Sequence, residues 1–198
     1  MRGAARRVIR GRRGHSQGVP GIATIVIDML NPYDHEDGEP LAQQVANHIE
    51  PLRRLIELTR EAGAELIYVN DNYEDFTATS KDLVQRAVDG RHPELVEPIL
   101  PPEGTPFLQK VRHSAFYSTA LDHLLRSHGI GTIVLAGQVT EQCILYSALD
   151  AYVRRLEVRV ARDAVVPLDI GLGDAALRMM ARNMRAHVVP GSEAFDRR

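Results

Sequence analysis

The stretch TIVLAGQVTEQCILYSALDAY, Thr132–Tyr152, places two hydrophobic patterns side by side. It begins with an apolar run that ends at Gly137, which is typical of a buried strand. After a mostly polar loop, apolar residues recur from Ile144 onward in one stripe at helical spacing. Cys143, the only cysteine of the chain, lies at the start of this second pattern. The stretch therefore predicts a buried strand, a loop and a helix whose first turn carries a free thiol.

Strand patterns and helix patterns alternate in the same way along the rest of the chain. Apolar runs predict strands at 22–29, 64–70, 106–111, 131–137, 156–161 and 187–190. Helical patterns occupy 40–63, part of 71–90, 119–129, the segment after Thr140, and 171–186. Pro51 is expected to break or kink the first helix, and the proline-rich region 91–106 is expected to be irregular. The alternation predicts an α/β fold with a parallel sheet covered by helices on both faces.

The composition is that of an ordinary globular domain. The chain has 198 residues, a net charge of -2 and 25% charged residues, which fits one domain with a sizeable core. One cysteine cannot form an internal disulfide, so a cytoplasmic location is the default expectation. No apolar run approaches the roughly 20 residues needed to cross a membrane, and we expect no membrane partner.

The first 21 residues differ from the rest because they contain six arginines and no acidic residue. They lack the apolar core of a signal peptide. A transit peptide, a nucleic-acid arm and a disordered leader all fit such a start, and we interpret the segment as a disordered leader or an over-long start assignment. The remaining chain is net acidic, so we expect no nucleic-acid partner. The domain is expected to span residues 22–198.

Three polar residues occupy the carboxyl ends of predicted strands, where ligands bind in sheets of this kind. Asp28 ends the first strand, Lys110 ends the third, and Cys143 follows the fourth. A free thiol has a pKa of about 8.5, so it needs a base to become a nucleophile at neutral pH. Asp28 can be that base. Lys110 can keep Asp28 ionised and stabilise the thiolate. With Thr140 as N-cap, the N–H groups of the first helical turn favour a negative sulfur and can receive an oxyanion.

Each of these residues also has an ordinary structural explanation. A lone cysteine on an apolar helix usually packs in a core. A lysine near a strand end is usually solvated, and an aspartate there usually forms a turn. The hypothesis of a nucleophilic Cys143 therefore rests on all three residues lying at the same edge of one sheet.

Four segments together resemble the isochorismatase-like cysteine hydrolase superfamily: IVIDMLNPY, FLQKVRHSAFYSTALDHLLRSHGI, TIVLAGQVTEQCILYSALDAY and VRVARDAV. They stand in family order and cover most of residues 24–190. The resemblance implies a three-layer α/β/α fold with a six-stranded parallel sheet. It also implies an Asp–Lys–Cys triad that matches Asp28, Lys110 and Cys143, and hydrolysis of amide-type C–N bonds through a thioester on the cysteine.

The resemblance implies two further properties of the site and the assembly. A cis peptide bond is expected between Gln138 and Val139, and the N–H groups of Val139 and Cys143 are expected to form an oxyanion hole. Members of the superfamily usually assemble as dimers or tetramers, so a homodimer or homotetramer is expected here.

The chain departs from two branches of this superfamily. Nicotinamidases bind a divalent metal through an Asp-x-His pair after the second strand, but here Asp71 is followed by Tyr73 where the histidine would be. We therefore expect no metal site, no other cofactor and no nicotinamidase activity. Isochorismatases proper cleave a vinyl ether and lack the nucleophilic cysteine. The presence of Cys143 favours amide chemistry instead.

The predicted function is hydrolysis of a C–N bond in a small amide, lactam or ureido substrate through a thioester. The alternatives are a vinyl-ether hydrolase of an isochorismate-like acid and a catalytically idle interaction module. Six residues follow the strand ends closely enough to line a substrate pocket: Asn31, Tyr33, Asn72, Tyr73, Phe116 and Tyr117.

Overall fold

The computed structural model describes residues 21–196, so the predicted leader, apart from Gly21, lies outside the described residues. Within this part of the chain, parallel strands form one six-stranded sheet in the order β3-β2-β1-β4-β5-β6. The strands are β1 Ile22–Ile27, β2 Glu65–Asp71, β3 Phe107–Lys110, β4 Thr132–Gln138, β5 Glu157–Val166 and β6 His187–Val189. Each apolar run that predicts a strand therefore forms one, with shifts at the ends.

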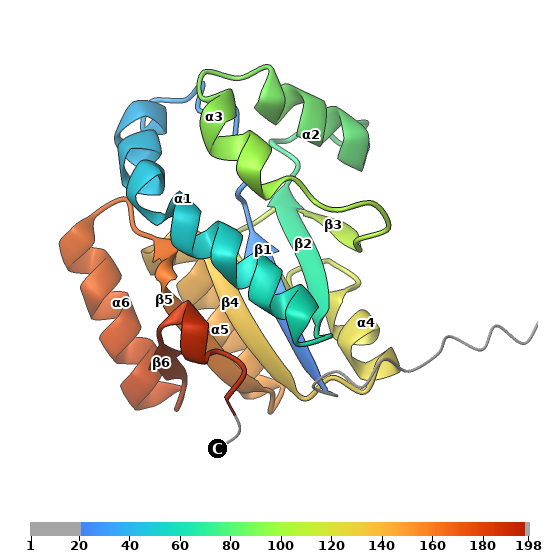
Figure 1. Cartoon of the computed structure of the whole chain (residues 1–198), viewed down its shortest axis with the longest axis vertical. Helices are drawn as coiled ribbons and strands as arrows, with labels where there is room; N and C mark the ends of the chain where they lie inside the picture. The colour runs from blue at the N-terminus through green and yellow to red at the C-terminus, as the bar shows by residue number, and fades with distance from the viewer. Residues whose placement is uncertain (1–20, 197–198) are drawn as a thin grey trace, which may run out of the picture.

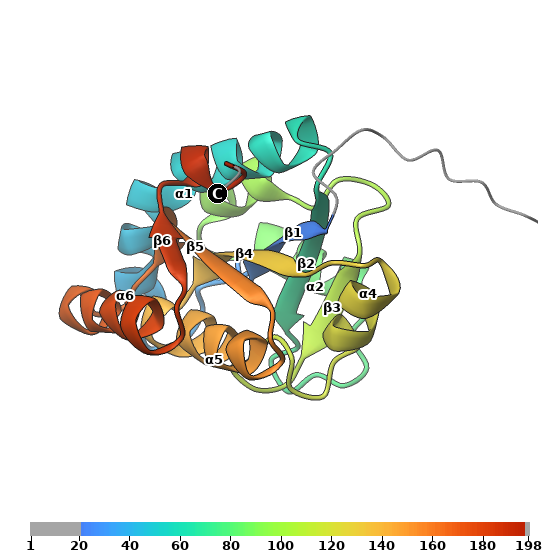
Figure 2. The ribbon, with the colours of Figure 1, turned by 90° about the horizontal axis from the view of Figure 1, so that it is seen from below.

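Helices cover both faces of the sheet and complete the expected three layers (Figures 1 and 2). Figure 2 shows α1 on one side of the strands and α5 and α6 on the other. The helices are α1 Gly38–Glu61, α2 Ser80–Val88, α3 Pro93–Val96, α4 Leu121–Ser127, α5 Leu145–Val153 and α6 Ile170–Asn183. Three short helical turns complete the described chain: the 3-10 turns η1 Glu97–Ile99 and η3 Gly191–Glu193, and the wider π-type turn η2 Thr140–Ile144.

Two apolar clusters hold the layers together, one on each side of the sheet. Val26 of β1 packs with α1, while its neighbours Ile25 and Ile27 pack with the helices of the opposite face. Because both faces of β1 are covered, its sequence is almost entirely apolar. Thr24 is the polar exception, and its hydroxyl is satisfied by a 2.8 Å hydrogen bond with the Thr59 hydroxyl on α1.

The order of the strands reverses between β1 and β4. The chain proceeds from β1 outward to β2 and β3 and then crosses to β4 on the other side of β1. Such a reversal leaves a crevice beyond the carboxyl ends of the two strands. The strands approach closely there, because a Cβ on Gly137 would overlap the carbonyl oxygen of Ile27. Gly137 also has a φ of +110°, a backbone conformation that glycine adopts readily and that residues with a side chain rarely adopt.

Two details of the secondary structure differ from the sequence-based expectations. Helix α1 continues through Pro51, and the side chains of Leu52 and Leu55 directly after it are fully buried. This burial offsets the backbone hydrogen bond that proline cannot make. The region 91–106, which we expected to be irregular, contains α3 and η1, whose Leu95 and Ile99 pack into the core.

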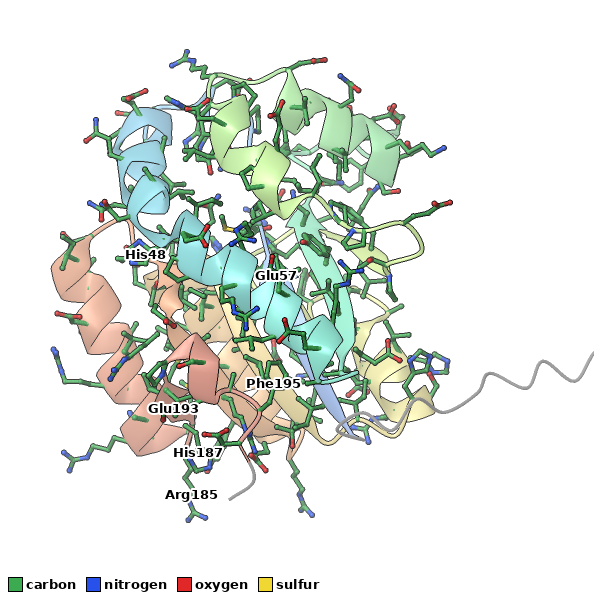
Figure 3. The ribbon with its side chains drawn as sticks, in the orientation of Figure 1. His48, Glu57, Arg185, His187, Glu193 and Phe195 are labelled. Atoms are coloured by element: carbon green, nitrogen blue, oxygen red, sulfur yellow. The ribbon has the colours of Figure 1, made fainter. Side chains whose placement is uncertain are left out.

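The outer side of α1 is charged rather than apolar. Figure 3 shows Glu57 on this helix, where its carboxylate pairs with Arg53 and Arg54. Pairs of this kind between exposed side chains each contribute little to stability.

Among the described helices, none is long and apolar enough to cross a membrane.

Candidate active site

The structure brings Asp28, Lys110 and Cys143 together at the carboxyl edge of the sheet. The Lys110 ammonium lies 2.9 Å from an Asp28 carboxylate oxygen and 3.8 Å from the Cys143 sulfur. The negative charge of Asp28 and the positive charge of Lys110 both act on the Cys143 thiol. Lys110 is 1% exposed and the other two residues are 8% exposed. We call these three residues the Asp–Lys–Cys cluster.

The strands on either side of β1 hold Asp28 in place. Its backbone has a φ of +55°, which turns the chain sharply at the end of β1. One carboxylate oxygen accepts a 2.7 Å hydrogen bond from the backbone N–H of Asp71. On the other side, the Gln138 side chain donates a 2.7 Å hydrogen bond to the Asp28 carbonyl. Contacts with β2 and β4 therefore fix the direction in which the carboxylate points.

The turn that carries the cysteine begins directly after β4. The peptide bond between Gln138 and Val139 is cis, and Cys143 lies in the first turn of the helical segment that follows. Thr140 does not cap this segment, which corrects our expectation. Val139 occupies the N-cap position, and the buried Thr140 hydroxyl has no hydrogen-bond partner among the described residues. The first turn is a wide π-type turn, so Thr140 is already inside it.

The backbone at Val139, one of the two expected oxyanion donors, acts to lower the pKa of the Cys143 thiol, against the larger effect of burial. Val139 and Cys143 both line the cavity beside the cluster. Both residues that carry the expected donors therefore border this cavity.

Asp71 is a neighbour of the cluster that the sequence analysis considered only as a metal ligand. Its carboxylate lies 3.2 Å from the Lys110 ammonium, and its other oxygen accepts a 2.8 Å hydrogen bond from the N–H of Tyr73. Lys110 therefore faces two carboxylates, those of Asp28 and Asp71. The signal in the sequence is the position of Asp71, which ends β2 beside the strand that leads to Asp28.

Burial and charge set the protonation of the cluster. Burial raises the pKa of the Cys143 thiol, and the negative charge of Asp28 raises it further, while Lys110 acts in the opposite direction. Burial also raises the pKa of Asp28, against the pull of Lys110. For Lys110 burial alone would lower the pKa, but the surrounding negative groups raise it, so the ammonium stays charged. The resting cysteine is therefore a thiol.

A cavity of about 570 Å³ opens onto the cluster. Asn31 and Tyr73, two of the predicted lining residues, lie in its wall. The sequence analysis missed a larger group of wall residues: Pro32, Asp34, His35, Leu41, Asp71, Arg86, His113, Gln138 and Gln142. Asp71 and Gln138 end strands β2 and β4, whereas the others come from loops, from η2 and from helices α1 and α2, whose approach to the site has no simple pattern in the sequence.

The other four predicted lining residues lie outside the cavity wall. Tyr33 is fully buried, with its ring against the edge of His92. The Asn72 side chain is buried and accepts a hydrogen bond from the backbone N–H of Glu74. Phe116 is part of the core, whereas Tyr117 is 55% exposed on the surface. The loops after β1, β2 and β3 turn these side chains away from the site.

The fold and this cluster define a three-layer α/β protein with a buried thiol, a carboxylate and an ammonium beside a cavity. The model of the isochorismatase domain family matches residues 23–192. The chain therefore belongs to the isochorismatase family of hydrolases.

Individual relatives cover most of the chain. It is 29% identical over 175 residues to the isochorismatase family protein YaaI of Bacillus subtilis, a match that covers 88% of this chain and 97% of that protein. It is 28% identical to the maleamate amidohydrolase of Pseudomonas putida, which covers 72% of this chain and 71% of that protein. The crystal structure of N-carbamoylsarcosine amidase from Thermoplasma acidophilum superimposes with a TM-score of 0.68 at 31% identity, covering 87% of this chain and 97% of that one.

Proposed function

We propose that this protein is a cysteine hydrolase that cleaves a C–N bond in a small amide, lactam or ureido substrate. The observation that carries the proposal is the position of Lys110, whose ammonium contacts both the Asp28 carboxylate and the Cys143 sulfur beside the cavity. The similarity to a maleamate amidohydrolase and an N-carbamoylsarcosine amidase supports the same reaction type.

The first half of the reaction forms a thioester. Asp28 takes the thiol proton, and the sulfur attacks the carbonyl carbon of the substrate. The negative charge moves to the carbonyl oxygen, which the N–H groups of Val139 and Cys143 stabilise. The C–N bond then breaks, and the nitrogen leaves with the proton that Asp28 returns to it. The acyl group remains on Cys143.

The second half releases the acid. Asp28 takes a proton from water, and the resulting hydroxide attacks the thioester carbon. The C–S bond breaks, and the proton held by Asp28 returns to the sulfur, which restores the thiol. Lys110 keeps its charge throughout, and it favours whichever of Asp28 and Cys143 is negative at each step. No redox step and no external co-reactant besides water is needed.

The Cys143→Ala variant tests this proposal. Wild-type protein incubated with a panel of primary amides, lactams and carbamoyl compounds should show an acyl adduct by intact-protein mass spectrometry and release of the amine or ammonia. The variant should show neither, while its circular dichroism spectrum stays that of the wild type. Hydrolysis that survives the loss of the thiol would contradict the proposal and favour the vinyl-ether alternative. A wild-type thiol that forms no adduct with any of these compounds would favour the interaction module.

We also propose that the protein forms homo-oligomers through the outer face of α5. This face presents Tyr146, Leu149, Tyr152 and Val153, all between 40% and 62% exposed. Exposed apolar side chains that gather on one helix are typical of an interface. Sedimentation analysis of the wild type and Leu149→Glu should give an oligomer and a smaller species, respectively. We further propose a cytoplasmic location, because the single cysteine can form no internal disulfide and the chain therefore carries no sign of an oxidising compartment.

A further inference from the structure

The turn that carries Cys143 contains a carboxylate that the proposed reaction does not use. Of the described residues 138–143, four line the cavity, whereas Thr140 and Glu141 do not. Glu141 lies two residues before the cysteine, inside η2, and its side chain is directed toward the start of α6. The contacts of Glu141 therefore bear on the position of the turn rather than on a molecule in the cavity.

The Glu141 carboxylate is bound to the backbone at the start of α6. One oxygen accepts hydrogen bonds of 3.0 Å and 2.8 Å from the backbone N–H groups of Leu168 and Asp169. Asp169 is the N-cap of α6, so these N–H groups lie at the positive end of that helix. Hydrogen bonds to an ionised carboxylate are stronger than those between neutral groups. Glu141 thus links the cysteine turn firmly to a second element.

The packing around this carboxylate leaves it little freedom. Its second oxygen is buried and has no hydrogen-bond partner among the described residues. That oxygen is 3.8 Å from the position that a Cβ on Gly173 would occupy, and the same Cβ would lie 2.5 Å from the Pro167 side chain. The lack of a side chain at Gly173 therefore lets α6 approach Glu141 closely. An unpaired buried carboxylate oxygen costs free energy, so stability alone does not explain this arrangement.

The η2 turn has few other anchors. No side chain caps its N-terminus, and the Thr140 hydroxyl is unpaired in the described part of the chain. Apart from the contact of Cys143 with Lys110, Glu141 makes the only side-chain hydrogen bonds that join η2 to another described element. Glu141 stands midway between Val139 and Cys143, the residues that carry the expected oxyanion donors. A shift of Glu141 would therefore move both donors.

We propose that Glu141 is a positioning residue, whose carboxylate ties η2 to the start of α6 and so holds the N–H groups of Val139 and Cys143 toward the substrate carbonyl oxygen. This inference rests on the proposed function, because it concerns the oxyanion hole of that reaction. A donor is effective when it lies about 2.7–3.1 Å from the charged oxygen, so a small displacement of the turn weakens it. Glu141 itself contacts neither the substrate nor the reacting atoms.

Four variants separate the hydrogen bonds of Glu141 from its charge and from the stability of α6. Glu141→Ala removes the carboxylate. Glu141→Gln keeps an oxygen that can accept from both N–H groups without the charge, and Glu141→Asp keeps the charge on a side chain one methylene shorter. Asp169→Ala is the matched control, because it removes the carboxylate that accepts a 2.8 Å hydrogen bond from the Leu172 N–H at the same helix start. Circular dichroism checks the fold of each variant.

Propionaldehyde labelled with carbon-13 at its carbonyl probes the donors without requiring turnover. The Cys143 sulfur bonds to the carbonyl carbon, and the thiol proton ends on the former carbonyl oxygen, which gives a reversible thiohemiacetal. Carbon-13 NMR distinguishes this tetrahedral carbon from that of the free aldehyde and gives the dissociation constant. The kcat and KM values are measured in parallel for any amide that the wild type hydrolyses.

The expected result follows the hydrogen bonds rather than the charge. Glu141→Ala should weaken the thiohemiacetal on the order of 10-fold, and it should lower kcat on the order of 10- to 100-fold with KM nearly unchanged. This is less than the ~100- to 1,000-fold cost of losing a donor outright. Glu141→Gln should restore most of both values, and Glu141→Asp should restore less. Asp169→Ala should bind the aldehyde as the wild type does.

Three outcomes would overturn the inference: wild-type affinity in Glu141→Ala, an equally large loss in Asp169→Ala, or better recovery in Glu141→Asp than in Glu141→Gln. The last comparison applies even if Glu141→Ala does not fold. If the adduct depends on Glu141 but no amide is hydrolysed, the proposed reaction fails and the positioning role stands. If amides are hydrolysed equally well without the Glu141 carboxylate, the reaction stands and the positioning role fails. A wild-type protein that forms no adduct would overturn both.

Discussion

Replacing Lys110 by methionine removes the positive charge at the centre of the site while keeping a side chain of similar length. The ammonium lies 2.9 Å from Asp28 and 3.2 Å from Asp71. At an effective dielectric constant of about 20, each contact corresponds to an attraction of about 5 to 6 kcal/mol before desolvation is subtracted. The Asp71 side chain is 29% exposed, so solvent weakens its share. Removing one partner of a buried pair costs about 3–5 kcal/mol of stability, and we expect Lys110→Met to fall in that range.

The loss of stability should depend on pH, and its sign follows from Asp28. Burial raises the pKa of Asp28, and Lys110 opposes this effect. Without Lys110 the pKa of Asp28 rises further. A carboxyl group whose pKa is higher in the folded protein than in the unfolded chain makes the folded state more stable as pH falls through its folded pKa. The stability gap between Lys110→Met and the wild type should therefore be largest at mildly alkaline pH and shrink as the solution is acidified.

Urea denaturation followed by circular dichroism at several pH values measures this gap. Lys81→Met is the matched control, because Lys81 is the only other lysine and lies exposed on α2. The control should unfold as the wild type does at every pH. Lys110→Met should lack hydrolytic activity even at the acidic pH where its stability recovers. A gap that is constant with pH, or that grows on acidification, would refute this account of the buried charges.

Three further predictions concern the neighbours of Lys110. Asp71→Asn removes a negative charge that raises the pKa of Asp28, so the acidic limb of the pH profile for kcat/KM should move to lower pH, whereas Asp34→Asn at the cavity rim should leave it in place. Asp28→Asn removes both the base and the main negative charge facing the thiol. This variant should lose hydrolysis yet react faster than the wild type with iodoacetamide near neutral pH, and slower labelling would contradict the prediction. Gly137→Ala should destabilise the fold by at least about 1–3 kcal/mol, because the added Cβ would overlap the Ile27 carbonyl and the φ at this position is positive. Thermal unfolding measures the effect, and an unchanged melting temperature would contradict the prediction.

The sequence predicted most of the fold because the sheet is buried on both faces. A strand such as β1 has no polar alternation, so its apolar run and the Asp28 that ends it are visible without a structure. The same logic located the cluster, since Lys110 ends a parallel strand and Asp28 and Cys143 each follow the end of one. Pro51 was harder to interpret, because its effect depends on how firmly Leu52 and Leu55 pack against the sheet.

The cavity wall was less predictable because it is built by loops and helix ends. Phe116 and Tyr117 follow Lys110 closely in the sequence, but one turns into the core and the other onto the surface. Arg86 is far from every strand end along the sequence. It reaches the cavity because the turn around Asp75 fixes the direction of its side chain. Such placements depend on the three-dimensional path of a loop, which residue types alone do not determine.

The location of Cys143 has a practical consequence for measurements on this protein. It is the only thiol in the chain, and it lies in the wall of the cavity. A thiol reagent can therefore modify one atom of the molecule, and the mass gained by the intact chain reports the state of the site without peptide mapping. The fraction of chains that stay unmodified in the presence of a test compound then measures the fraction of sites that the compound occupies. The chain can thus be screened for ligands by protection from a single covalent label, before any substrate has been identified.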